Sequence, residues 1–217
     1  GEISGNGGNV GGFIGSIDVG SNIDVSISEC THNGNVNGTG DSVGGLIGFM
    51  GYKGTGVSSI INMKITLPNC MNNGSVNGKN NVGGMIGYMG EIENIILSIP
   101  NYTNYGSVTG TGGYVGGFVG YVKHNINITI VVLDGHVYGT KSGMGSGGIG
   151  GFVGYADDNQ IMNMTILNCT NEGNISGNGG CEGGFIGYIG YSKNTVLAIS
   201  NCTRDGEISG NGRNVGG

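Results

Sequence analysis

The chain has little charge, little proline and no long apolar run, and each shortage excludes a class of protein. Charged residues make up only 10% of the 217 residues, against roughly a quarter in an ordinary soluble domain. The net charge of −6 and the scattered lysines and arginines argue against a nucleic-acid-binding surface. The only two prolines, Pro68 and Pro100, exclude a collagen-like triple helix. No apolar run approaches the length of about 18 residues that a membrane-spanning helix needs.

Helical patterning is also missing, whereas glycine and β-branched residues are abundant. The 52 glycines accompany an apolar content of 36%, which argues against a disordered chain. Segments such as NIDVSIS at 22–28 and NINITIVV at 125–132 alternate apolar with polar residues, and this period of two predicts strands. We therefore expect almost no helix, with glycines at corners or at places where two backbones approach closely.

One glycine-rich motif recurs along the whole chain at spacings of 33 to 39 residues. It reads GGFIG, GGLIG, GGMIG or GGFVG, and the last copy is cut to GG. The first glycines of the copies are Gly11, Gly44, Gly83, Gly116, Gly150, Gly183 and Gly216. Ahead of the motif come an Asn-Cys-Thr-Asn-like stretch and a Gly-x-Val/Ile-x-Gly element, such as GNVNG at 34–38. Residues 1–217 are therefore predicted to form a single repeat array.

The repeat predicts an all-β fold, a parallel β-solenoid (β-helix) of about six coils of roughly 33 residues. Each coil would hold three short strands around a roughly triangular section, and stacking would bury the apolar faces that one unit cannot bury alone. Corner asparagines would form amide ladders. The spacing of 39 residues predicts a longer loop around Gly51–Ser58. The alternative fold is an antiparallel β-sandwich, although its strands would not need to share one sequence.

The segment Gly45-Leu46-Ile47-Gly48 and its variants resemble the GLUG motif, a repeat of large secreted or cell-surface proteins. The variants include residues 12–15 and 184–187, and the resemblance extends to every repeat in the chain. It implies a repetitive, extracellular, β-rich region with a structural or adhesive role. It implies no activity and supplies no catalytic residues.

Four of the five cysteines, Cys30, Cys70, Cys169 and Cys202, share one position in the repeat. Neighbouring coils would bring them to about 4.8 Å, within the Cα range of a disulfide. They are candidates for either a buried thiol ladder or disulfides. Cys181 lies outside this phase, so it is expected to be free or intermolecular.

The sequence offers no constellation typical of catalysis. The histidines His32, His124 and His136 occupy unrelated phases, and the adjacent Asp157 and Asp158 indicate a solvated turn. We find no acids that recur at one phase in neighbouring coils, which argues against a β-helical polysaccharide lyase or hydrolase. We expect no enzymatic activity, no cofactor and no metal site, since close-set Cys and His pairs are missing as well.

Sequons of the type Asn-x-Ser/Thr are numerous and would be glycosylation sites in a secretory pathway. They begin at Asn37, Asn73, Asn101, Asn127, Asn163, Asn168, Asn174 and Asn201. Asn101, Asn168 and Asn201 share one phase. If these asparagines lie at an outward corner, their glycans would form a line along the rod. If they form an internal amide ladder instead, they could not be modified.

The low charge and the regular phase favour a structural segment of an extracellular or cell-surface filament, stalk or coat. Its partner would be itself, end to end through strand edges and laterally. The alternative is an adhesin or carbohydrate-binding solenoid that uses an in-phase aromatic column, which is equally consistent with a purely structural stack. The column comprises Phe49, Tyr88, Tyr121, Tyr155 and Tyr188. Because residues 1–12 and 206–217 agree at all but one position, we expect a slice of a longer periodic body, either a covalent tandem repeat or a subunit polymer.

Overall fold

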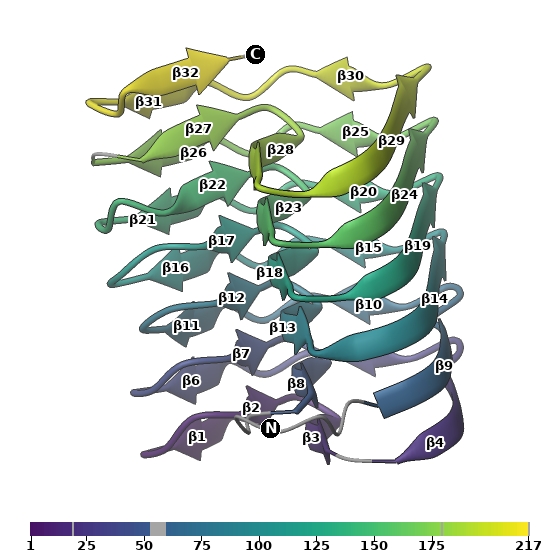
Figure 1. The fold of residues 1–217 in the computed structure, drawn as a ribbon. Coiled ribbons are helices and arrows are strands. Elements are labelled where there is room, and N and C mark those ends of the chain that lie inside the picture. The colour runs from purple at the N-terminus through teal and green to yellow at the C-terminus, as the bar shows by residue number, and fades with distance from the viewer. Residues whose placement is uncertain (19, 53–59, 179, 217) are drawn as a thin grey trace.

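The fold is a parallel β-solenoid, as the repeat predicts (Figure 1). A computed structural model describes residues 1–18, 20–52, 60–178 and 180–216. Throughout these ranges the chain forms strands and no helix, and every strand pairing is parallel. The pairing excludes the antiparallel β-sandwich. Most of the loop expected around Gly51–Ser58 falls outside the described residues.

Two seven-stranded sheets, A and B, form one side of the coil. Sheet A comes from the Gly-x-Val/Ile-x-Gly element and consists of β1 (Ile3–Gly5), β6 (Val36–Gly38), β11 (Val76–Gly78), β16 (Val108–Gly110), β21 (Lys141–Gly143), β26 (Ile175–Gly177) and β31 (Ile208–Gly210). Sheet B consists of β2 (Val10–Gly11), β7 (Val43–Gly44), β12 (Val82–Gly83), β17 (Val115–Gly116), β22 (Gly148–Gly150), β27 (Cys181–Gly183) and β32 (Asn214–Gly216).

Three six-stranded sheets, C, D and E, complete the coil. Sheet C consists of β3 (Ile14–Asp18), β8 (Ile47–Gly51), β13 (Ile86–Gly90), β18 (Val119–Lys123), β23 (Val153–Asp157) and β28 (Ile186–Gly190). Sheet D consists of β4 (Ser21–Ser26), β9 (Ile60–Thr66), β14 (Ile92–Pro100), β19 (Ile126–Leu133), β24 (Gln160–Leu167) and β29 (Lys193–Ser200). Sheet E consists of β5 (Thr31–His32), β10 (Met71–Asn72), β15 (Thr103–Asn104), β20 (His136–Val137), β25 (Thr170–Asn171) and β30 (Thr203–Arg204).

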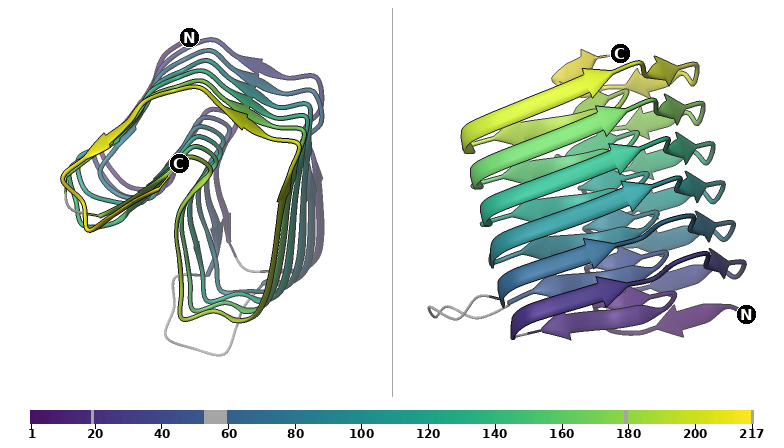
Figure 2. Two further views of the ribbon diagram at one scale, coloured as in Figure 1. Left: turned by 90° about the horizontal axis from the view of Figure 1, so that it is seen from above. Right: turned by 90° about the vertical axis from the view of Figure 1, so that its right-hand side faces the viewer.

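The coil has five strands and a bent section, so the expected three strands and triangular section are wrong (Figure 2). The bend lies at the glycine doublet, which separates sheet B from sheet C. A Cβ atom on Gly117 would lie 2.0 Å from the carbonyl oxygen of Gly151, and one on Gly84 would lie 2.1 Å from that of Gly117. Only glycine lets successive coils approach this closely. The doublet is thus a re-entrant corner rather than part of one strand.

The bend divides the interior into two apolar cores. A narrow core between sheets A and B consists mainly of stacked valines, including Val36, Val43 and Val76. The larger core lies within sheets C, D and E and holds most of the buried isoleucines and methionines, together with Phe118 and Phe152. Each apolar residue packs on its equivalent in the next coil, because the repeat pairs in register.

Amide ladders run along the corners, which confirms the prediction for asparagine. In the buried ladder, Asn72 Nδ2 donates to Asn104 Oδ1 at 2.8 Å and to the Gly74 carbonyl at 2.8 Å. An exposed ladder links Asn127, Asn94, Asn62 and Asn22 by bonds of 2.8–3.1 Å. These bonds satisfy polar groups that stacking would otherwise leave without partners.

Lys141 repairs a break in the buried ladder. At the ladder position of β20 stands Val137, and Lys141 replaces a valine of the narrow core four residues later. Its fully buried amine donates to Asn171 Oδ1 at 2.6 Å and to the carbonyls of Gly139 and Gly173 at 2.9 and 3.0 Å. The amine therefore takes the place of the missing asparagine amide.

Candidate functional site

The in-phase aromatic residues lie on the outer face of sheet C, and none of them belongs to either apolar core. Successive ring centroids from Phe49 to Tyr188 are 5.1, 5.6, 5.4 and 4.4 Å apart, in stacked and edge-on arrangements. Tyr88, Tyr155 and Tyr188 are half-buried, whereas Phe49 and Tyr121 are only 1% and 8% exposed. The column thus presents ring edges and partial faces along the rod axis.

The re-entrant corner places the residues before sheet B opposite this column. Tyr114 precedes β17, and its ring centroid lies 4.5 Å from that of Tyr121 and 4.8 Å from that of Tyr155. Its φ of 64° is left-handed, a conformation that Asn9, Ser42 and Asn81 share at the equivalent positions. The repeat imposes this conformation, and in one coil it carries an aromatic ring into the column.

A hollow of about 400 Å³ lies over the N-terminal half of the column. Phe49 and Tyr88 contribute from sheet C, while side chains from both flanking turns line its sides. The lining residues are Asp41, Ser42, Phe49, Tyr52, Asn81, Tyr88, Glu91, Lys123 and His124. The combination of aromatic rings with a few polar groups in a concave surface is typical of a ligand site. We call this hollow, together with the whole aromatic column that lies beneath and beyond it, the aromatic groove.

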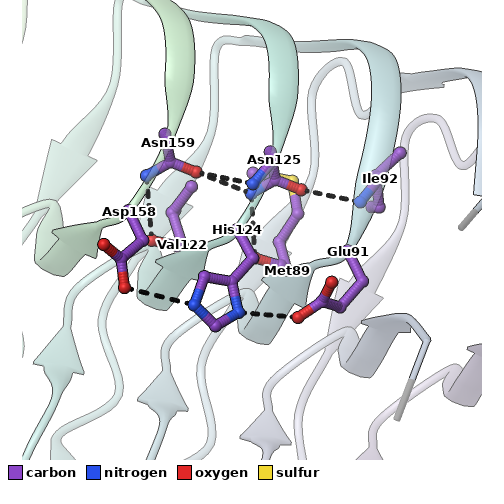
Figure 3. Close-up of polar contacts among 8 residues, drawn as sticks. All are labelled: Met89, Glu91, Ile92, Val122, His124, Asn125, Asp158 and Asn159. Carbon is purple, nitrogen blue, oxygen red and sulfur yellow. Dashed lines mark hydrogen bonds and ion pairs between the residues drawn. The ribbon is translucent and has the colours of Figure 1, made fainter. Parts of the chain in front are cut away.

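Glu91, His124 and Asp158 form a row on one edge of the groove, in three successive coils (Figure 3). His124 Nδ1 lies 2.6 Å from Glu91 Oε1, and His124 Nε2 lies 3.1 Å from Asp158 Oδ2. All three side chains are exposed. Beside the row, Asn159 and Asn125 form a buried amide pair, with 3.0 Å between Asn125 Nδ2 and Asn159 Oδ1.

This row is not visible as a run of acids in the sequence, because its two acids lie in alternate coils with a histidine between them. Contrary to expectation, acids do share one phase in neighbouring coils at Glu172 and Asp205, but these residues lie outside the groove. Glu91, His124 and Asp158 each lie eight residues after the first anchor glycine, since 91 − 83, 124 − 116 and 158 − 150 are equal. Aligning the copies by charge as well as by residue type would have found them. Because a histidine can pair with a carboxylate in the next coil, histidine and acidic residues can alternate at one position of the repeat.

Burial and nearby charges raise the pKa of two tyrosines in the groove. Burial, together with the nearby Glu91 charge, raises the pKa of Tyr88 to about 12. Burial also raises the pKa of Tyr155, and the Asp157 charge adds to this effect. The ammonium of Lys123 lies 6.0 Å from the ring centroid of Tyr121. The groove therefore offers hydroxyl groups, aromatic faces and carboxylates together.

A second aromatic pair lies outside the groove and was also missed. Tyr105 and Tyr138 follow sheet E, are 51% and 37% exposed, and stack with centroids 4.8 Å apart. They share one phase, but the other copies have Asn or acidic residues there. The pair provides a matched control for experiments on the groove.

The four in-phase cysteines lie in a column that packs against the large core, and all five cysteines are free thiols. Cys70 and Cys169 are buried, and burial raises the pKa of both thiols, that of Cys169 to about 12. Tyr102 occupies this column between them, fully buried, with its ring 4.7 Å from that of Phe118. Tyr102 and Gly135 together separate the pair Cys30 and Cys70 from the pair Cys169 and Cys202 in this column. Cys181 lies apart, beside Asn214.

The sequons are distributed over several corners. Asn73, Asn101, Asn127, Asn168, Asn174 and Asn201 are exposed, whereas Asn37 and Asn163 are half-buried. The in-phase group lies on an outward corner, where Asn101 Nδ2 donates to Asn69 Oδ1 at 3.0 Å. An outward position and an amide ladder are therefore compatible, since these side chains are both exposed and hydrogen-bonded.

Across the described ranges, no cluster of three or more His, Cys, Asp or Glu side chains is arranged to hold a metal ion. No helix long and apolar enough to cross a bilayer is present in the same residues. Comparisons with protein-family models, curated proteins and solved structures found no match to this chain. The resemblance to the GLUG motif accordingly stays a prediction.

Proposed function

We propose that this protein is an extracellular, carbohydrate-binding β-solenoid of the adhesin type, which binds glycans along the aromatic groove. The observation that carries the proposal is the outward position of the aromatic column, with a hollow lined by carboxylates over its N-terminal half. Sugar rings stack their apolar faces on aromatic side chains, and their hydroxyls bond to carboxylates and amides. Because neighbouring coils lie about 4.8 Å apart, a linear glycan along the axis would pass the half-buried rings of Tyr88, Tyr155 and Tyr188.

A glycan array tests this proposal, with binding constants then measured by calorimetry. We expect Tyr88→Ala and Tyr155→Ala to weaken binding about ten-fold or more, since each removes a stacking surface. Tyr105→Ala serves as the control, because its ring lies outside the groove. Wild-type protein that binds no glycan, or tyrosine variants that bind as well as wild type, would contradict the proposal.

A second candidate function is structural, as a body that assembles through its terminal coils. Leu197 and Ile199 in β29 are 43% and 41% exposed, whereas their partners in β24, Met164 and Ile166, are at most 1% exposed. At the other end Phe13 is 46% exposed. Covering these side chains with another coil would bury apolar surface and pair the open strand edges.

Analytical ultracentrifugation and negative-stain electron microscopy test the structural candidate. Stacking predicts particles that lengthen with protein concentration, and Leu197→Lys is expected to shorten them by placing a charge in the joint. Discrete monomers at all concentrations would overturn end-to-end assembly. The glycan-binding proposal does not depend on this result, because the groove runs along the side.

A further inference from the structure

The aromatic groove is strongly anionic. Asp41 and Glu91 line the hollow, and Asp157 and Asp158 follow in the next coils, while Lys123 is the permanent cation among them. His124 lies between two of these carboxylates and contacts both. Even with a protonated imidazole, the carboxylates outnumber the cations. A cationic ligand is therefore favoured over an anionic one at this surface.

Asp157 supplies a second, independent observation. Its side chain is only 9% exposed, and within the described part of the chain its Oδ1 has no hydrogen-bond partner. It pairs in register with Lys123, which lines the hollow, and lies two residues after Tyr155 on sheet C. A buried carboxylate oxygen without a partner costs free energy unless a donor reaches it. Asp157 thus carries an unused acceptor beside the aromatic column.

An ammonium group already lies against this column. Lys123 Nζ is 6.0 Å from the Tyr121 ring centroid, the separation at which a cation is attracted to an aromatic face. The neighbouring coil below has Gly90 in the equivalent place, and the coil above Asp157 has Gly190. The rings of Tyr88 and Tyr188 lie over these glycines and fill the space that a side chain would take there.

We propose, building on the glycan-binding function above, that the groove selects polysaccharides with free amino groups, such as polymers of glucosamine. The sugar rings stack on the tyrosines, and the protonated amines bind the carboxylates of Glu91, Asp157 and Asp158. Glu91 and Asp158 lie two coils apart with His124 between them, so they meet alternate amines of an extended chain whose sugar repeat is about one coil.

Calorimetric titration with oligomers of equal length tests the selectivity. The probes are a glucosamine oligomer, its fully N-acetylated form, a neutral glucose oligomer and a uronic acid oligomer. We expect the glucosamine oligomer to bind about ten-fold more tightly than the acetylated one at low salt. The difference should shrink at 1 M salt, where charges are screened beyond about 3 Å.

Paired variants separate this inference from the glycan-binding proposal. Glu91→Gln combined with Asp158→Asn should abolish the preference for the free amine, whereas Glu172→Gln, which removes an exposed carboxylate outside the groove, should retain it. Circular dichroism and thermal melting verify that each variant is folded. Equal binding of the acetylated and free-amine oligomers overturns the selectivity alone. Absence of binding to every oligomer overturns the selectivity, and absence of binding on the whole glycan array overturns both proposals.

Discussion

Individual residues in this repeat are best explained by their equivalents one coil away. Tyr102 places a large ring in the column that elsewhere holds cysteine, and the next coil has Gly135 there. A Cβ atom on Gly135 would lie 2.8 Å from the Phe118 ring, which Tyr102 contacts. A large residue in one coil thus requires a small one in the next, because the core is close-packed.

Lys141 and Val137 show the same compensation with hydrogen bonds. We expect Lys141→Val to lower the free energy of unfolding by about 1–3 kcal/mol, since it leaves Asn171 Oδ1 and two buried carbonyls without a donor. The double variant Val137→Asn with Lys141→Val restores the pattern of the other coils and should recover most of the loss. Urea unfolding measures both. A double variant no more stable than the single one would contradict the ladder interpretation.

Burial of the same amine predicts a pH dependence. It lowers the pKa of Lys141 from 10.5 to about 7. Between these values the unfolded chain binds a proton that the folded chain does not, so this group makes the free energy of unfolding rise with pH. We expect the stability difference between wild type and Lys141→Val to grow between pH 7 and 9, by at most about 1.4 kcal/mol per unit. A difference independent of pH in urea titrations would contradict the lowered pKa of this amine.

At the scale of elements, the glycine doublet decides the shape of the coil. Its second glycine contacts the equivalent backbone in the next coil throughout the stack, including Gly45 on Gly84 and Gly117 on Gly151. The bend that results faces sheet C toward the residues before sheet B and so forms the aromatic groove.

Gly117→Ala tests the role of this corner. A Cβ atom there would lie 2.0 Å from a backbone oxygen, so the coils must separate locally. We expect a loss of at least about 3 kcal/mol in the free energy of unfolding, or failure to fold. Ser107→Ala, in the turn directly before β16, is the control and should change stability by less than about 0.5 kcal/mol. A Gly117→Ala variant as stable as wild type would show that the corner tolerates side chains.

At the scale of the whole molecule, stability is expected to depend on neighbouring coils rather than on one central core. Each coil contacts only the coils beside it, so the terminal coils have one partner and the inner coils two. Apolar residues that the terminal coil leaves exposed, such as Leu197 and Val215 at 43% and 50%, reflect this difference.

Hydrogen exchange should follow the same gradient. We expect amides of β14 and β19 to exchange most slowly, and those of β4 and β29 at the ends of sheet D to exchange fastest, because terminal coils open locally. Mass spectrometry of exchanged peptides resolves these strands. Uniform protection along sheet D would indicate a single cooperative unit, or terminal coils covered by an assembled neighbour, which a dilution series distinguishes.

The sequence by itself determined the parallel stacking, the length of the coil and the corner ladders, because a side chain that recurs at one phase must stack on its copy. It also placed the aromatic residues in one column. Only the tertiary structure decided that the coil bends at Gly12 and its equivalents, that this bend puts the column on the outside, and that Glu91, His124 and Asp158 meet beside it. The physical reason is that a periodic sequence specifies contacts between coils directly, whereas the path within one coil depends on how closely non-equivalent backbones can pack.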